Sequence, residues 1–94
     1  MVQAVRMKNY IIAGTYQEYS DWLRRKILSP SVHVCVSTPA VLRGTQNPHG
    51  WFIGTWRKRD DLEYIFMELL TRTDITSDSH RRINNIWGKW KERL

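Results

Sequence analysis

Residues 9–15, with the sequence NYIIAGT, decide the fold. The nearly continuous apolar run in residues 9–13 is typical of a strand that is buried on both faces, as strands of a parallel sheet are. Gly14 ends the run, and Thr15 has the side chain expected at the start of a helix. Glu18, three residues further on, can reach back to complete a capping box with Thr15. The stretch therefore predicts a strand that passes directly into a helix.

Two further segments predict strands, and two predict helices. Residues 32–36 (VHVCV) and residues 51–53 (WFI) are short, apolar and rich in strand-forming residues. Apolar residues recur at helical spacing from Tyr16 to Ile27, and again after Asp60, which is expected to cap the second helix.

A shorter helix is predicted between the second and third strands. Thr38 suits the capping position, Pro39 suits the first helical position, and Gly44 suits the stop.

A basic amphipathic helix is predicted at the end, over residues 78–94, beginning at Asp78 or Ser79. The element order is then strand, helix, strand, short helix, strand, helix, helix. Alternating strands and helices predict an α/β fold with a small three-stranded parallel sheet, Rossmann-like, and right-handed crossovers. We expect one domain over residues 1–94, with its core in residues 1–77 and the basic helix added to it.

The composition bounds the class of protein. The 94 residues carry a formal net charge of +6, which favours acidic partners such as nucleic acid or an acidic protein surface. The five tryptophans either fill the small core or, for one or two of them, anchor a partner. The single cysteine excludes an intramolecular disulfide, which fits a reducing cytoplasm. No signal peptide is predicted, and no apolar stretch approaches the ~20 residues of a membrane span.

No group of residues has the spacing of a catalytic or metal site. The three histidines, His33, His49 and His80, are not paired with other ligands at metal-binding spacing. The acidic pair at 60–61 suits the positive end of a helix. Cys35 lies inside an apolar run, as a buried and unreactive thiol does. We therefore expect no catalytic residues, no metal and no cofactor, and a protein that is not an enzyme.

The carboxyl ends of the predicted strands form the first candidate site. Two of these strands end in the same pair, Gly14-Thr15 and Gly54-Thr55. In open parallel sheets this edge is the usual ligand crevice, where an anion can meet a helix N-terminus. The candidate anion-binding residues are Gly14, Thr15, Ser37, Thr38, Arg43, Thr55, Arg57 and Arg59. The alternative needs no ligand, because glycine permits the turn and threonine caps the helix.

The last helix is the second candidate site, as a surface for a partner. Its candidate interface residues are Trp87, Trp90, Arg82, Lys89 and Arg93. Two alternatives remain open: the apolar stripe of this helix packs on the protein's own core, or it packs partly across a homodimer.

The stretch from residue 10 to 70 resembles small uncharacterised proteins encoded by actinobacterial phages. The resemblance rests on the segments IIAGTY (11–16), VSTPAVLRG (36–44) and FIGTW (52–56), which precede an acidic and apolar helix. It implies a Rossmann-like core and a phage accessory role, but no activity, and it does not cover the last helix. We accordingly expect a non-enzymatic phage accessory protein in the cytoplasm of the bacterial host, which binds a host protein through an exposed basic and aromatic face. The alternative is binding of nucleic acid or a nucleotide at the strand edge.

Overall fold

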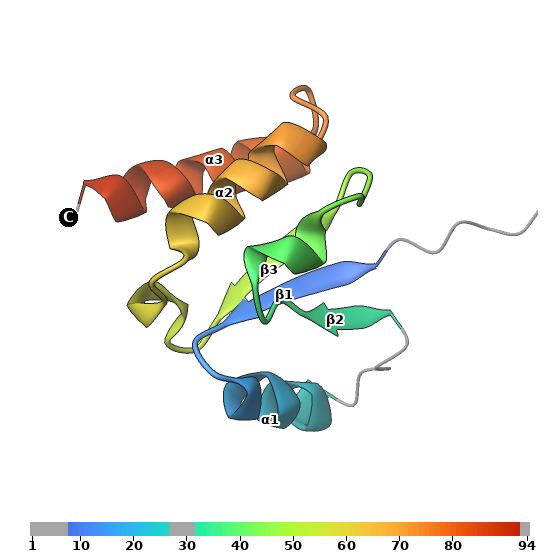
Figure 1. Cartoon of the computed structure of the whole chain (residues 1–94), viewed down its shortest axis with the longest axis vertical. Coiled ribbons are helices and arrows are strands. Elements are labelled where there is room, and N and C mark those ends of the chain that lie inside the picture. Colours follow the sequence, from blue (N-terminus) through green and yellow to red (C-terminus); the bar gives the residue numbers. More distant parts are fainter. Residues whose placement is uncertain (1–7, 27–31, 93–94) are drawn as a thin grey trace, which may run out of the picture.

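Three short parallel strands form the centre of the molecule, with α-helices on both faces (Figure 1). The computed structural model describes residues 8–26 and 32–92. The predicted α/β fold with a three-stranded parallel sheet is confirmed. The elements are, in order, β1 (Asn9–Ala13), α1 (Tyr16–Lys26), β2 (His33–Cys35), the 3-10 helix η1 (Pro39–Leu42), β3 (His49–Ile53), the 3-10 helix η2 (Trp56–Lys58), α2 (Leu62–Arg72) and α3 (Asp78–Lys91).

The strand β1 lies in the middle of the sheet, in the order β2-β1-β3. Ile11 stands opposite Cys35 of β2 and Trp51 of β3, so these three side chains point to the same face. Ile11 and Ile12 are fully buried, one on each face. The central position of β1 explains why residues 10–13 of this strand are apolar.

The two faces of the sheet have separate cores. On one face, α2 and α3 cover Ile12 with Phe66, Leu69 and Ile83. On the other face, α1 covers Ile11 and Ala13 through Tyr19, Trp22 and Leu23. Figure 1 shows the sheet between these two helical layers.

The predicted capping box at the start of α1 is confirmed. The Glu18 backbone N–H donates to the Thr15 hydroxyl at 3.2 Å, and the Thr15 backbone N–H donates to the Glu18 carboxylate at 3.1 Å. The Tyr19 N–H donates to the Thr15 carbonyl as the first helical bond. Two local side chains thus define where β1 ends and α1 begins.

Several predicted boundaries were wrong. β3 begins at His49 rather than at residue 51, because Gly50 lies directly under Leu69, where an added Cβ would be 3.0 Å from the nearest leucine methyl carbon. β2 extends only over His33–Cys35. Thr38 precedes η1 but makes no side-chain capping bond, and residue 61 rather than 60 precedes α2.

Candidate functional site

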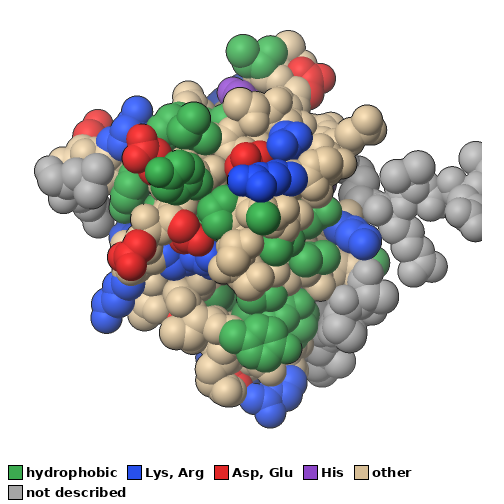
Figure 2. All heavy atoms as spheres, in the orientation of Figure 1, with side chains coloured by type: hydrophobic (Ala, Val, Ile, Leu, Met, Phe, Trp, Pro, Cys, Tyr) green, Lys and Arg blue, Asp and Glu red, His purple; other side chains and the backbone are tan. Residues whose placement is uncertain are grey.

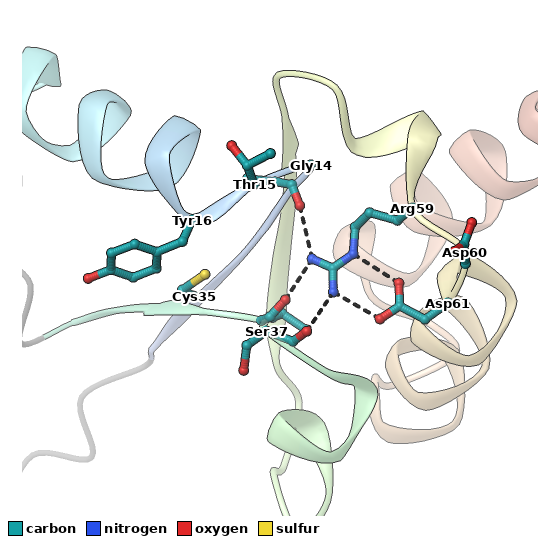
Figure 3. Close-up of a pocket in the computed structure, with 10 residues that line it drawn as sticks. Gly14, Thr15, Tyr16, Cys35, Ser37, Arg59, Asp60 and Asp61 are labelled. Atoms are coloured by element: carbon teal, nitrogen blue, oxygen red, sulfur yellow. Dashed lines mark hydrogen bonds and ion pairs between the residues drawn. The ribbon is translucent and has the colours of Figure 1, made fainter.

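A cleft opens at the carboxyl ends of β1 and β2, where the sequence predicted a ligand edge (Figure 3). Its volume is about 420 Å³. It brings together four of the predicted residues, and the other four lie outside its described lining. The described lining consists of Ala13, Gly14, Thr15, Tyr16, Cys35, Val36, Ser37, Arg59, Asp60 and Asp61.

Arg59 crosses this cleft, and all five of its N–H donors are used within the chain. Two donate to the carbonyls of Ala13 and Val36, at 2.9 and 2.6 Å, and one to the carbonyl of Ser37 at 3.1 Å. The remaining two form a bidentate ion pair with Asp61, both at 2.9 Å. Figure 3 shows the guanidinium held between the strand ends and α2. Arg59 therefore ties the sheet to α2 and has no donor left for a ligand.

The repeated Gly-Thr pairs also have an internal partner, the Glu18 carboxylate. The Thr55 backbone N–H and hydroxyl donate to it at 2.8 and 2.7 Å. Thr15 donates to the same group through its backbone N–H. These bonds, those of Thr55 most of all, hold the pKa of Glu18 below its ordinary value. The donors that the sequence offered to an external anion thus bind the protein's own carboxylate.

Glycine is required at both loops because the contact is so close. A Cβ on Gly14 would lie 2.0 Å from the Thr55 hydroxyl oxygen, and one on Gly54 would lie 2.1 Å from a Glu18 carboxylate oxygen. Gly54 also has a φ of +57°, in the left-handed region. The repeated Gly-Thr pairs of the two loops therefore have a structural role, which is to allow this close contact.

The remaining strand-edge candidates are spread out. The Arg57 guanidinium stacks on the Trp56 ring, 4.4 Å from its centroid. Thr38 and Arg43 are exposed at the two ends of η1. Burial raises the pKa of the Cys35 thiol, which makes it a poor nucleophile at neutral pH. With Asp60 present as well, the described lining of the cleft has neither a free cation nor the positive charge of an anion site.

The tryptophans of α3 contact the protein's own core. The rings of Trp87 and Trp90 both lie 5.8 Å from the ring of Phe66, and Ile83 beside them is fully buried. Lys89 lines a cavity of about 490 Å³ on α3 together with Arg81 and Arg82. Arg93 lies outside the described residues.

Arg82 is the predicted interface residue with a different role. Its side chain extends from α3 and donates a hydrogen bond to the Gly50 carbonyl. Its guanidinium lies 4.4 Å from the centroid of the Trp51 ring. Burial lowers the pKa of this guanidinium. Arg82 thereby joins α3 to the outer strand and to an aromatic ring that belongs to the opposite face of the sheet.

That ring belongs to a surface that we call the α1–β3 groove. It consists of two adjoining cavities that share Trp22. The first, of about 240 Å³, is lined among the described residues by Asn9, Trp22, His33 and Trp51. The second, of about 460 Å³, is lined by Trp22, Arg25, Lys26 and Ile53. Neither described lining contains a carboxylate, and Trp51 is 44% exposed.

The sequence did not single out this groove. It arises because α1 packs chiefly against the central strand and leaves β3 half covered on that face. Trp51 and Ile53, two residues apart, both point into the uncovered area. The alternation of side chains along β3 is the signal in the sequence that places Trp51 and Ile53 on one face. It shows that they are exposed only once the strand order is known.

Figure 2 shows one face on which basic and acidic side chains are interspersed with hydrophobic ones. Within residues 8–26 and 32–92, no three His, Cys, Asp or Glu side chains gather as metal ligands would. In the same residues no helix has the length and hydrophobicity that crossing a membrane requires. No family model, no curated protein and no solved structure matches the chain.

Proposed function

We propose that this chain is a non-enzymatic binding protein and that the α1–β3 groove binds single-stranded nucleic acid. One observation carries the proposal: Trp22 joins a cavity that contains a second indole to a cavity that contains two cations, with no carboxylate in either described lining. Proteins that bind single strands combine aromatic platforms for the bases with a basic path for the phosphates.

The charge of the groove supports a polyanionic partner. Arg25 and Lys26 are exposed at the end of α1, where no ion pair of the described residues engages them. Arg82 adds a third cation beside Trp51. The net charge of +6 adds a long-range attraction to the same class of partner.

The strand-edge cleft is the weaker location for this function. Arg59, the arginine of its described lining, is fully engaged, and Asp60 and Asp61 would repel a phosphate. The groove is the stronger location because Arg25 and Lys26 form no ion pair with the described residues, whereas Arg59 does.

A binding titration with matched charge reversals tests the proposal. The probe is a labelled oligothymidylate of ten nucleotides, titrated at low and rising salt and followed by fluorescence anisotropy. R25E/K26E, in the groove, is compared with R57E/K58E, which makes the same charge change on η2. We expect the groove variant to weaken binding about tenfold or more and to reduce the salt slope by about 1.4, the value for two phosphate contacts to a single strand.

Two outcomes would overturn the proposal. One is that the wild-type protein fails to bind single strands at low salt. The other is that R57E/K58E weakens binding as much as R25E/K26E does, since the strand edge or net charge alone would then explain the binding.

The second candidate function is binding of a partner protein, with a host protein as the partner that the phage resemblance implies. Trp51, exposed and stacked by Arg82, is the observation that favours it, because tryptophan and arginine are enriched at binding hot spots. Cross-linking of a cysteine placed at position 53 to a bound partner protein tests this function. The expected result is a nuclease-resistant protein adduct that W51T abolishes, and adducts that survive W51T would reject the groove as the interface.

A further inference from the structure

Resting on the proposed function, we infer that the cavity between Trp22 and Trp51 holds a single unstacked base of the bound strand. The two indoles line one cavity of about 240 Å³, several times the ~30 Å³ share of a water molecule in the liquid. This is room for one planar ring, and its described lining is formed by two indoles, an imidazole and one amide.

The Trp51 ring is held in place before any ligand arrives. Its indole N–H donates to the Asn9 side-chain oxygen at 3.0 Å. One of its faces is covered by the Arg82 guanidinium. A ring fixed in this way loses little conformational freedom on binding, which favours stacking of a base against it.

The polar group in the cavity suits the edge of a base. Because the Asn9 oxygen accepts from Trp51, the amide NH₂ is the part of Asn9 that remains to donate. A base with carbonyl oxygens on its edge matches this donor, and thymine has two. Oligothymidylate is therefore the probe of choice.

The neighbouring cavity explains why the planar group belongs to a nucleic acid strand. Trp22 lines both the indole cavity and the cavity that Arg25 and Lys26 line, so a chain that inserts a ring into the first has two cations within the adjoining one. A strand of nucleotides supplies rings and phosphates in this alternation.

The test separates base insertion from the attraction of phosphates. Binding of ten-nucleotide oligothymidylate is compared with that of an abasic decamer that carries the same phosphates. We expect the wild-type protein to prefer oligothymidylate about tenfold, as stacking of one base gives. W51T should lose this preference, W51F should retain most of it, and Y64A, which removes an exposed aromatic residue outside the groove, should retain all of it. Thermal unfolding of each variant verifies that it is folded.

Equal affinity of the wild-type protein for the two decamers would overturn base insertion. The proposed function would still stand in that case if R25E/K26E weakened both complexes. Binding of neither decamer would instead remove the proposed function, so the two failures are distinguishable. A preference that persists in W51T would place the base elsewhere and would also reject the inference.

Discussion

Glu18 is the residue at which the two Gly-Thr loops meet. Its carboxylate accepts hydrogen bonds from Thr15, three residues away, and from Thr55, 37 residues away. It therefore serves α1 as part of a capping box and the whole sheet as a link between the ends of β1 and β3. The Glu18 carboxylate thus occupies the donors that the sequence predicted for an external anion.

We expect Glu18 to make the stability of the protein sensitive to acid. The bonds from Thr55, first of all, lower the pKa of Glu18 in the folded state from the ordinary value of 4.5, which the unfolded chain regains. A carboxyl group with a lowered folded pKa contributes stability above its unfolded pKa, and this contribution is lost as the pH falls through the folded value. E18Q should be less stable than the wild-type protein at pH 7. Between pH 5 and pH 3, E18Q should lose less stability than the wild-type protein loses, and the difference should roughly equal the stability that the ionised Glu18 contributes.

Urea unfolding at the two pH values measures this difference. E63Q is the control, because Glu63 is an exposed carboxylate on α2 that no described side chain engages. The same acid sensitivity in E18Q as in the wild-type protein would show that another carboxylate is responsible.

Gly14 and Gly88 predict opposite effects of the same substitution. An alanine at Gly14 places its Cβ 2.7 Å from the Thr55 backbone oxygen, besides the hydroxyl, so the two loops must separate. An alanine at Gly88 in α3 meets nothing within 4 Å. We expect G14A to lower the free energy of unfolding by about 1–3 kcal/mol, and G88A to raise it by about 0.5–1 kcal/mol. Chemical denaturation of both variants checks the signs, and stabilisation by G14A would contradict the close contact.

The two outer strands each have a carbonyl occupied by a side chain. The Tyr19 hydroxyl donates to the His33 carbonyl of β2 at 2.9 Å, and Arg82 donates to the Gly50 carbonyl of β3. Occupied carbonyls and short strands reduce pairing with other chains at sheet edges. The addition of a further strand at either edge of this sheet is therefore disfavoured.

Arg59 connects three elements, and lysine cannot replace it. Its planar guanidinium reaches the ends of β1 and β2 and the start of α2 at once, and its side chain is only 10% exposed. A lysine has one nitrogen and would leave several carbonyls or the carboxylate of Asp61 unpaired. We expect R59K to lower the free energy of unfolding by about 2–3 kcal/mol. R57K, which keeps a cation over the Trp56 ring, should change it by less than about 0.5 kcal/mol. If R59K and R57K changed the free energy of unfolding in urea equally, the role of Arg59 in connecting the three elements would be contradicted.

The elements that could be predicted from the sequence are those with local causes. β1 and the capping box of α1 follow from residues within ten positions of one another. The start of β3 did not follow, because Gly50 indicates a loop until Leu69 is known to lie above it. The roles of Arg59 and Glu18 depend on partners up to 46 and 37 residues away, so no local pattern contains them. The exposure of Trp51 likewise depends on the strand order.

At the scale of the whole molecule, α3 belongs to the core and is not an addition to it. Ile83 is fully buried in the same cluster as Ile12 and Phe66, and the rings of Trp87 and Trp90 pack against it. Phe66 is thus covered by α3 as well as by the sheet. Without α3, one face of this small sheet would lose much of its apolar cover.

We therefore expect a chain that ends at residue 77 to lose cooperative thermal unfolding, as measured by circular dichroism. Because a truncated chain can aggregate, a point substitution in the full chain tests the same idea. I83A should lower the free energy of unfolding by about 2–5 kcal/mol, the usual cost of removing a buried isoleucine side chain. I75A, at a position that is 78% exposed, should change it by less than about 0.5 kcal/mol. A cooperative transition in the truncated chain would show that the first 77 residues fold alone and that α3 is free to leave the core for a partner. A harmless I83A would contradict the contribution of the buried Ile83 side chain to the core.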